Sequence, residues 1–480
     1  MPNVIWQPQP RQYAFMQRSE YEAFYGGAAG GGKSDVLVIE ALRQVEIPHY
    51  KAIIFRKTYT QLGELLAKAD NYYPRIVPGA KYNSQQHVWK FPSGARIYFG
   101  GMQHMKDRTK WQGWQFDFIG FDELTHFQFD EYSYMWSRNR ASGPGTRVYL
   151  RSTGNPGGVG HGWVKARWID PAPPMTTMRK RLDIVDADGN KITKWRTRIF
   201  VPAKLTDNKI LMENSPEYMQ SMMMLPQKER EALLDGNWDS FSGQVFMEWR
   251  NDPDRYADHK FTHVIEPFVV PKHWKIIMGY DWGYSKPFAC LWVAVDEQGK
   301  YYVINELYGC TGEPNHGVMW DDARIAKKIR EIEDEDPNLK GRRIERVADP
   351  AIFDASKVGG EGSQAELMER NGVYFERGDH ARIAGKMQLH YRMRFDDIGE
   401  CLLQVFNTCP HTIRTLPALV YSQISPEDVD SAQEDHLYDV LRYIAMRRKI
   451  SPPVVEKKPI DHFDPLDQRT RYQPKYYGYM

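Results

Sequence analysis

Short apolar runs that end in polar or small residues recur through the first third of the chain. Three of them predict strands: "EAFY" at residues 22–25, "FDFIGF" at 116–121 and "VYLRS" at 148–152. "SDVLVIEALRQV", which follows the first of these, repeats apolar residues every three or four positions, as an amphipathic helix does. Strands interleaved with helical segments predict an α/β domain.

A second pattern of strands begins near residue 271. "WKIIMGYDWG" is an apolar strand, and "FACLWVAVDEQGKYYVINELYG" reads as two strands about a turn at 296–299, so the three predict a β-meander. A helix is expected at about 321–332, then a strand in "IERVADPA" and a last helix in "EDHLYDVLRYIAMRR". One stripe of the last helix is apolar and consists of Leu437, Val440, Leu441 and Ile444.

Length, charge and cysteine content narrow the class of protein. A chain of 480 residues is too long for one hydrophobic core, so two domains are expected. The 64 Lys and Arg nearly balance the 62 Asp and Glu, so any contact with DNA must come from local patches. The four cysteines show neither CxxC nor zinc spacing, which fits a reducing compartment. Because no apolar run approaches about 20 residues and the N-terminus does not resemble a signal peptide, we expect a cytosolic-type protein without a membrane span.

The loop "YGGAAGGGKSDV" joins the first predicted strand to the first predicted helix and matches G-x-x-x-x-G-K-[ST]. Glycines let backbone N–H groups face phosphate oxygens, and the helix N-terminus adds partial positive charge. The lysine reaches the outer phosphates, and the serine is a ligand for Mg²⁺. A flexible glycine-rich turn is the alternative, but spacing, the Lys-Ser pair and the flanking elements all favour nucleotide. The predicted ATP-binding residues of the loop are Gly27, Gly30, Gly31, Gly32, Lys33 and Ser34.

Two adjacent acids and two small polar residues lie at the ends of the later strands. Asp122 is placed to hold Mg²⁺ beside the phosphates, and Glu123 to orient or deprotonate the attacking water. Thr153 and Asn155, in "STGNPGG", are candidates to sense the γ-phosphate, because strand ends in open α/β sheets gather at the ligand crevice. The alternative for each pair is an ordinary strand-end turn.

Two arginines in "MWSRNRASGPG" precede a flexible Gly-Pro segment. Either Arg138 or Arg140 is a candidate arginine finger that would stabilise charge in the transition state, across a subunit boundary or within the chain. Exposed arginines are ordinary on protein surfaces, so a solvated side chain is an equal alternative.

A second set of acids lies at the edges of the later apolar elements. Asp281 and Asp349 end predicted strands, whereas Asp435 and Asp439 share a face of the last helix, opposite its apolar stripe. Together these acids would make an oxygen cage for two Mg²⁺ or Mn²⁺ ions that cleave a phosphodiester. The order of meander, helix, strand and acidic helix is that of an RNase H-like nuclease. Singly, each acid is as well explained as a turn cap or a solvated charge, and Lys286 as an exposed lysine rather than a phosphate contact.

From about Gln12 to about Arg448, this series of motifs resembles the large subunit of a tailed-phage terminase. The resemblance rests on "GGAAGGGKS", "FRKTYTQL", "IGFDEL", "SRNR", "STGNPGG", "GYDWG", "VADPA" and "DHLYDVLRYI". It implies a P-loop ATPase domain of the ASCE type followed by an RNase H-like nuclease domain, with Gln12 as the adenine-side glutamine. Some relatives carry an arginine inside the phosphate loop; this loop has none, so a finger from a neighbouring subunit is expected. Family members use Asp or His as the last nuclease ligand, which adds His436 to the candidates.

The resemblance also implies a function and partners. ATP hydrolysis would drive double-stranded DNA through a portal protein into a procapsid, and a metal-dependent endonuclease would cut concatemeric DNA before and after filling. The implied partners are the terminase small subunit and further copies of the chain in a ring, expected to be a pentamer, in the host cytoplasm. Two alternatives stay open: a helicase-like ATPase whose second domain only grips DNA, and a scaffold in which the phosphate loop is structural.

The expected organisation divides the chain into an ATPase domain (1–203), a lid and linker segment (204–270), a nuclease domain (271–449) and a flexible tail (450–480). The methionines and leucines of "MQSMMMLPQKEREALL", in the linker, are expected to pack in a core. The tail is rich in Pro, Tyr and charge and is expected to order only on binding.

Overall fold

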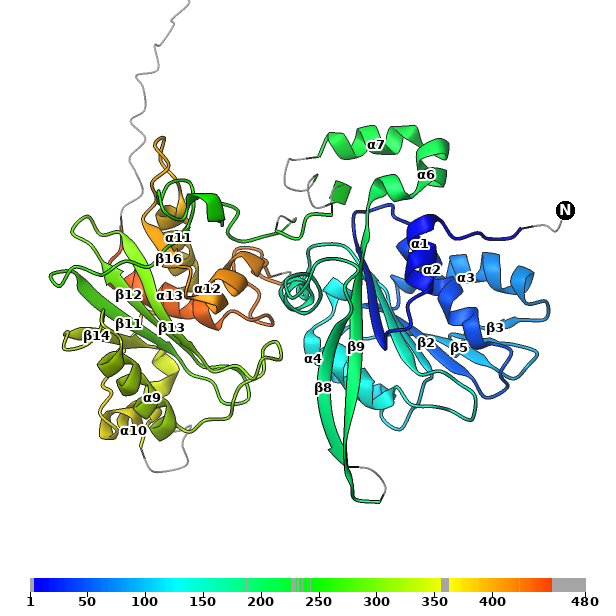
Figure 1. Ribbon diagram of the computed structural model, residues 1–480, viewed down its shortest axis with the longest axis horizontal. Helices are drawn as coiled ribbons and strands as arrows, with labels where there is room; N and C mark the ends of the chain where they lie inside the picture. The colour runs from blue at the N-terminus through cyan, green and yellow to red at the C-terminus, as the bar shows by residue number, and fades with distance from the viewer. Residues whose placement is uncertain are drawn as a thin grey trace, which may run out of the picture.

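The computed structural model describes residues 4–185, 188–225, 230, 233–234, 236–239, 241, 243–354, 362–422 and 424–450. Two mixed α/β bodies lie side by side, each built on one sheet (Figure 1). The predicted tail lies, from residue 451 onward, outside the described residues. Of the helices in the described part, none has the length and apolar character needed to cross a membrane.

The first sheet has the strand order β3-β4-β5-β2-β6-β7-β1-β9-β8. Every neighbouring pair from β5 to β9 is parallel, and antiparallel strands lie at both edges. β7 lies between β1, which leads into the phosphate loop, and β6, which ends just before Asp122. An additional strand between these two is the ASCE-type arrangement, so this part of the predicted fold is confirmed. The strands are β1 (Glu22–Gly27), β2 (Lys51–Arg56), β3 (Lys81–Asn83), β4 (Val88–Lys90), β5 (Arg96–Gly101), β6 (Phe118–Phe121), β7 (Tyr149–Gly154), β8 (Met178–Val185) and β9 (Lys191–Ala203).

Both faces of this sheet are covered, because parallel strands that are buried throughout need a packed layer on each side. Aliphatic side chains such as Leu37 and Leu65 pack on one face, and a mainly aromatic cluster that includes Phe24, Phe121 and Trp168 packs on the other. The helical segments are α1 (Pro10–Met16), α2 (Lys33–Glu40), η1 (Ala41–Gln44), α3 (Leu62–Ile76), η2 (Met105–Trp111), η3 (Leu124–His126), α4 (Phe129–Tyr134), η4 (Met135–Arg138), α5 (His161–Val164) and η5 (Lys165–Ile169).

β8 and the first half of β9 form a two-stranded ribbon that projects from the body (Figure 1). β9 pairs with β1 only through residues 198–203, and its earlier residues pair with β8 alone. The side chains of this outer part are therefore largely exposed.

The segment after β9 forms η6 (Leu205–Asp207), α6 (Lys209–Asn214) and α7 (Pro216–Met223), which lie over the phosphate loop (Figure 1). The predicted packing of its methionines in a core is wrong for Met223 and Met224, which are 53% and 86% exposed. These short helices rest on the surface by one side only, so hydrophobicity alone did not reveal which side chains are buried.

The second sheet has the strand order β10-β16-β13-β12-β11-β14-β15. β11, β12 and β13 form the predicted antiparallel meander, and β14 adds to β11 in parallel. This arrangement is that of the predicted RNase H-like fold. The strands are β10 (Val264–Ile265), β11 (Lys275–Asp281), β12 (Ala289–Val295), β13 (Tyr301–Tyr308), β14 (Ile344–Ala348), β15 (Glu376–Arg377) and β16 (Leu403–Phe406).

Helices cover both faces of the meander. A Cβ on Gly279 of β11 would come within 2.6 Å of Val440, so α13 packs directly on the backbone there. On the opposite face, Trp292 donates a hydrogen bond to Glu333 of α9. Val245 and Phe246 already belong to this core, ahead of its first strand. The helical segments are η7 (Pro253–Arg255), α9 (Asp322–Glu335), η8 (Pro350–Phe353), α10 (Gln364–Arg370), α11 (Arg382–Met393), α12 (Pro410–Thr415), η10 (Leu416–Ala418) and α13 (His436–Arg447).

Candidate functional site

The phosphate loop joins β1 to α2 and turns back on itself through glycines. Gly27, Gly30 and Gly32 adopt φ of 135°, 72° and 67°, which glycine tolerates far better than other residues. A Cβ on Gly27 would also approach the carbonyl oxygen of Ala203 to 2.4 Å. The backbone conformation of the loop therefore depends on glycine at these positions.

Lys33 is the first residue of α2 and is buried against the loop. Its Nζ donates a hydrogen bond to the carbonyl of Ala28, in the centre of the loop. Burial lowers the pKa of Lys33 to about 8, although the carboxylates of Glu123 and Asp122 act in the opposite direction. The amino group therefore lies where the outer phosphates of a bound nucleotide would supply negative charge.

Asp122 follows β6, at the end of the sheet where the loop lies. Its side chain is 1% exposed, and Ser34 Oγ lies 3.1 Å and 3.2 Å from its two carboxylate oxygens. Thr153 donates a further hydrogen bond to Oδ1. The two predicted Mg²⁺ ligands thus lie together, and a carboxylate with a hydroxyl oxygen is a donor set that fits this ion.

Glu123 is held in an unusual conformation next to Asp122. Its φ is 53°, a left-handed value that costs about 1–3 kcal/mol for a residue other than glycine. Burial and the charge of Asp122 raise its pKa. Asn155 Nδ2 lies 3.4 Å from Oε1, so one residue of the predicted sensing pair contacts each acid.

Gln12 and Asn208 hold the loop from outside. Gln12 is buried and donates from Nε2 to the carbonyl of Gly32 at 2.8 Å. Asn208, which caps α6, donates to the carbonyl of Gly30. The predicted adenine-side glutamine therefore contacts the phosphate loop, and the lid segment is tied to the same loop.

Arg138 and Arg140 are not brought to this site. Both pair through their backbones with Phe116, two residues before β6, whereas Asp122 directly follows the other end of that strand. Six strand residues span roughly 20 Å. The guanidinium of Arg138 instead lies over the Tyr134 ring, 5.4 Å from its centroid. A finger within the same chain is therefore excluded by position, and only action on a neighbouring copy remains open.

The later acids gather at the ends of β11 and β14. Tyr280 pairs with Ala348 in parallel, so Asp281 and Asp349 are next to each other at the same end of the sheet. Asp281 is 7% exposed, and burial raises its pKa to about 6 against the opposing effect of His436.

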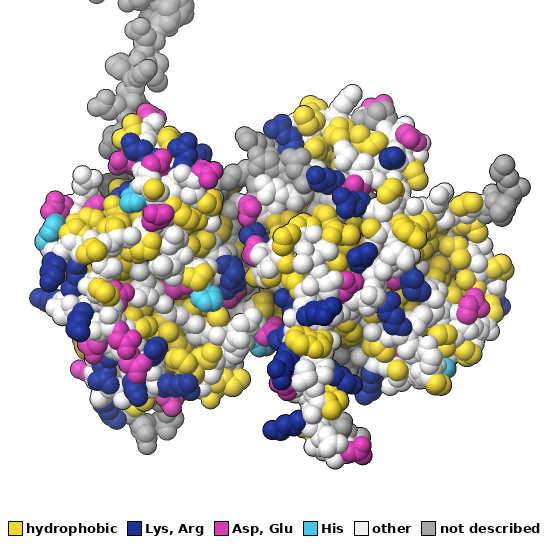
Figure 2. Space-filling view, in the orientation of Figure 1, with side chains coloured by type: hydrophobic (Ala, Val, Ile, Leu, Met, Phe, Trp, Pro, Cys, Tyr) yellow, Lys and Arg dark blue, Asp and Glu magenta, His cyan; other side chains and the backbone are white. Residues whose placement is uncertain are grey.

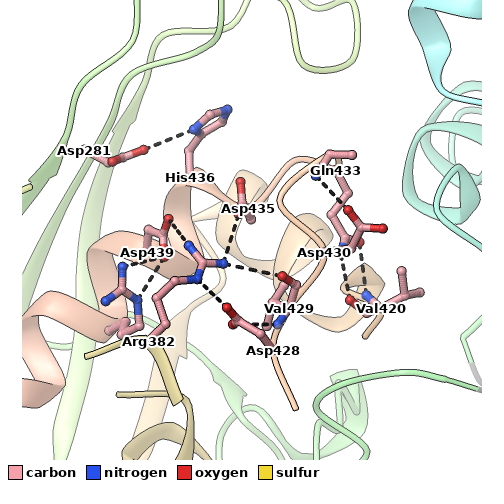
Figure 3. Close-up of polar contacts among 12 residues, drawn as sticks. Asp281, Arg382, Val420, Asp428, Val429, Asp430, Gln433, Asp435, His436 and Asp439 are labelled. Carbon is pink, nitrogen blue, oxygen red and sulfur yellow. Dashed lines mark hydrogen bonds and ion pairs between the residues drawn. The ribbon is translucent and has the colours of Figure 1, made fainter. Parts of the chain in front are cut away.

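His436, the first residue of α13, bridges two elements of this site. Its Nδ1 lies 3.1 Å from Asp281 Oδ2 (Figure 3). Its Nε2 lies 3.0 Å from Asn315 Oδ1. Burial would lower the pKa of His436, but the carboxylates of Asp281, Asp435 and Glu434 outweigh it and raise the pKa. The imidazole is therefore held beside a strand-end acid, which is the position that a candidate for the last nuclease ligand needs.

Asp435 and Asp439 face Arg382 of α11 (Figure 3). The guanidinium lies 3.8 Å from Asp435 Oδ2, 3.5 Å from Asp439 Oδ2 and 2.7 Å from Asp428 Oδ2. Asp435 precedes α13 rather than forming part of it, and it is 5% exposed. The predicted acidic helix face is thus a buried one, because α11 covers it.

Within the described part of the chain, no three His, Cys, Asp or Glu side chains are close enough to hold a metal ion together. The donors themselves fit Mg²⁺ or Mn²⁺, since all four candidate aspartates offer carboxylate oxygens. In this structure Asp281 is engaged with His436, and Asp435 and Asp439 with Arg382.

A comparison with family models identifies the first half of the chain. Residues 24–249, which include the phosphate loop, both ATPase acids and the sensing pair, match the family "Terminase large subunit, T4likevirus-type, N-terminal". Residues 24–249 belong to the terminase large-subunit family. The predicted resemblance is therefore confirmed over the segment that carries the ATPase motifs.

Solved large terminases also match this chain, at low identity. The large terminase of a thermophilic bacteriophage is 16% identical over 92% of this chain and 98% of its own, with a TM-score of 0.37. That of bacteriophage HK97 is 12% identical over 92% and 94%, with a TM-score of 0.44. The P22 large terminase nuclease domain is 17% identical over 43% of this chain and 93% of its own, with a TM-score of 0.33. No curated protein matches the chain.

The sequence did not assign a role to Arg56, which the structure places in the ATPase site. Arg56 ends β2 and directs Nε and Nη2 to Asp122 Oδ2, at 2.7 Å and 2.6 Å. β2 and β6 are neighbours in the sheet, with Phe55 opposite Phe121, so the two side chains meet at adjacent strand ends. The signal was present in "FRKTYTQL", whose Arg follows an apolar strand. This arginine supplies, within the chain, a guanidinium group that the phosphate loop lacks.

Lys286, in the second α/β body, faces the first. Its Nζ lies 3.8 Å from Asp130 Oδ2, and His316 Nε2 lies 2.7 Å from Asp130 Oδ1. Asp130 belongs to α4, which begins six residues after Glu123. These contacts join the nuclease meander to the segment that follows the ATPase acids.

Proposed function

We propose that this protein is a viral genome-packaging motor that hydrolyses ATP and cuts DNA with a separate metal-dependent endonuclease site. The observation that carries the proposal is the meeting of Ser34, Asp122, Glu123 and Asn155 around one phosphate loop. Those residues come from three separate strand ends, and their roles in ATP hydrolysis need this one location.

In the ATPase site, each side chain has a task set by its position. The loop amides and Lys33 bind the phosphates, and Glu123 is the base that orients and deprotonates the attacking water. A Mg²⁺ ion held by Ser34 and Asp122 would neutralise charge on the β- and γ-phosphates. Asn155, in contact with Glu123, relays loss of the γ-phosphate to β7 and the segment beyond it.

In the nuclease site, Asp281 and Asp349 would hold metal ions together with Asp435, Asp439 or His436. Two Mg²⁺ or Mn²⁺ ions held there would supply an activated water and would stabilise the leaving oxygen of a phosphodiester. His436 lies against Asp281 and orients its carboxylate. Arg382 contacts Asp435 and Asp439 and balances part of their negative charge.

The partners follow from the same proposal. Double-stranded DNA is the substrate of both sites, and the portal protein of a procapsid, the terminase small subunit and further copies in a pentameric ring are the protein partners. Because Arg138 and Arg140 lie far from their own loop, a ring would let either one act on the next copy as a trans finger. The host cytoplasm is the proposed location.

The direct test of the motor is ATP turnover with and without empty procapsids that carry a portal. Strong stimulation is expected from procapsids with a portal, and none from procapsids without one. Equal turnover without procapsids, with procapsids that carry a portal and with procapsids that lack one would contradict a packaging motor. In that case, loss of all turnover in Lys33→Ala would still support the ATPase assignment.

A DNA-translocating ATPase whose second domain only grips DNA is the second candidate. The ion pairs of Arg382 with Asp435 and Asp439 favour it, because they occupy carboxylates that a metal would need. Plasmid degradation with Mn²⁺ separates the two. Cutting that disappears in Asp281→Ala supports the nuclease, and the same residual cutting in wild type and Asp281→Ala supports the gripping domain.

A further inference from the structure

A cavity of about 400 Å³ lies between the two domains, on the same side as the projecting β8–β9 ribbon. Six basic side chains line it: Arg167, Arg179, Lys180, Arg198, His411 and Arg414. The first four come from the ATPase domain and the last two from the nuclease domain. We call this cavity the basic cleft.

The acids in the basic cleft do not balance its cations. Glu434 is fully engaged by Arg414, at 2.7 Å and 2.9 Å. Glu313 pairs with Lys180 and lies 3.9 Å from Arg167.

The other three arginines of the cleft differ in how far acids match their charge. Arg167 is 9% exposed and donates from Nη2 to Glu22, so its guanidinium is largely engaged. Burial together with the charge of Arg167 lowers the pKa of Arg198, the pattern of cations held together without enough negative charge. Arg179 forms no ion pair with any described residue. The cleft therefore offers donors to an anion.

The ribbon extends the basic cleft outward. Residues 178–198 contain seven Lys and Arg and three Asp, and Figure 2 shows basic side chains along the projecting part. Lys191 and Lys194 make no ion pair within the described part of the chain. Trp195 is 58% exposed and Val185 64% exposed. A two-stranded ribbon without a third strand is marginally stable alone, so contact with a partner would stabilise it.

The basic cleft also adjoins the nuclease acids. Glu434, which lines it, directly precedes Asp435, and Pro314 precedes Asn315, which contacts His436. A polyanion lying in the cleft would therefore pass beside the site that cuts it.

We propose that the basic cleft and the β8–β9 ribbon bind the phosphate backbone of double-stranded DNA. A β-ribbon fits the width of the DNA major groove, and arginine and lysine pair with phosphate. Arg179, Lys191 and Lys194 are backbone contacts, and Trp195 lies against the sugar-phosphate edge. The assignment rests on the proposed function, because it takes double-stranded DNA as the substrate.

The test measures how tightly two triple variants of the full chain bind a labelled 30-base-pair duplex. Binding is monitored by fluorescence anisotropy at a series of salt concentrations. The ribbon variant is Arg179→Glu, Lys191→Glu, Lys194→Glu. The control, Lys81→Glu, Lys90→Glu, Lys340→Glu, changes net charge equally but lies away from the cleft. We expect the ribbon variant to bind at least ten-fold more weakly, and its salt slope to become shallower by about 0.9 for each phosphate that it no longer neutralises. The control is expected to bind like wild type.

Equal affinities of the two variants would overturn the proposal. So would a ribbon variant that binds DNA normally but no longer self-associates with nucleotide, because the ribbon would then contact a second copy. Basal ATP turnover without DNA checks that the ribbon variant is folded. If it is not, the milder Arg179→Gln, Lys194→Gln pair is measured instead. A wild-type protein that hydrolyses ATP but binds no duplex would reject both this surface and the proposed function.

Discussion

At the residue scale, Arg56 determines how Asp122 is held. Both carboxylate oxygens of Asp122 are already engaged, one by Arg56 and the other by Thr153. Removing one partner of a buried ion pair costs about 3–5 kcal/mol. Arg56 is thus a positioning residue for the acid that would hold Mg²⁺.

We predict that Arg56→Ala lowers kcat for ATP by about 100-fold, the usual cost of losing a preorganised charge. Arg56→Lys should recover only part of the rate, because lysine cannot make two parallel contacts. Binding of a fluorescent ADP is expected to change much less than kcat. If kcat for ATP in Arg56→Ala stays within three-fold of the wild-type value, Asp122 does not need Arg56 for its position.

Arg138 and Arg140 give a second residue-scale prediction. Because both lie at the far end of β6 from Asp122, either one affects hydrolysis only through a neighbouring copy. A mixture of Glu123→Ala with Arg138→Ala, or with Arg140→Ala, should recover part of the ATP turnover that each variant lacks alone. If neither the mixture with Arg138→Ala nor the mixture with Arg140→Ala recovers activity, the hypothesis of a finger that acts on a neighbouring copy is rejected.

The sequence predicted the residues that are close along the chain and missed those that meet only in the folded sheet. Gly27 to Ser34 were predicted because spacing within one loop is a local property. The Arg56–Asp122 pair depends on β2 lying next to β6, and no local pattern encodes that neighbour. The same limit hid Arg382, whose contact with Asp439 depends on the packing of α11 against α13.

At the element scale, the packing of α13 on β11 sets the distance between the nuclease acids. Gly279 lies at the contact, and a Cβ there would meet Val440 and Ile444 at 2.6 Å and 2.9 Å. Gly279→Ala should displace α13 and destabilise the protein by about 1–3 kcal/mol, as overpacking does. DNA cutting is expected to fall while ATP turnover persists.

Gly63→Ala is the matched control. Gly63 lies in α3, and a Cβ there would meet nothing within 4 Å. This change should leave cutting unaffected and stabilise the protein slightly, since alanine favours helix more than glycine. Equal effects of the two substitutions on cutting would show that the α13–β11 contact does not set the site.

The elements themselves were predicted unevenly, for physical reasons. Buried strands such as β6 and β12 appear as apolar runs, and the sequence therefore predicted β1, β6 and β7 of the first sheet and β11 to β14 of the second. β10 has two residues and gives no pattern, although Val245 and Phe246 before it already join the second core. The β8–β9 ribbon carries mostly polar side chains because it lies outside any core.

At the scale of the whole molecule, two buried histidines link stability to pH. His161 and His263 are 1% and 0% exposed, and in each ring Nδ1 accepts a backbone N–H and Nε2 contacts a backbone carbonyl. Burial lowers the pKa of His161 to about 3 and that of His263 to about 4. Both rings are therefore neutral in the folded protein at pH values where the unfolded chain takes up protons.

We predict that the free energy of unfolding falls by about 1 kcal/mol per histidine between pH 7 and 5.5. The stability is present above the unfolded pKa of about 6.5 and is lost as the pH falls toward the folded values. Urea unfolding at both pH values is the measurement. The drop should shrink in His161→Gln and in His263→Gln but persist in His273→Gln, whose side chain is exposed. If the free energy of unfolding falls by the same amount in wild type, His161→Gln and His263→Gln, other groups cause the pH dependence.

The central claim is that one chain carries two independent active sites. ATP hydrolysis and Mn²⁺-dependent plasmid cutting, measured side by side on wild type, Lys33→Ala and Asp281→Asn, test it most directly. We predict that Lys33→Ala loses ATP turnover and still cuts, while Asp281→Asn stops cutting and still hydrolyses ATP. Persistence of hydrolysis in Lys33→Ala, or of cutting in Asp281→Asn, would contradict the assignment of that site.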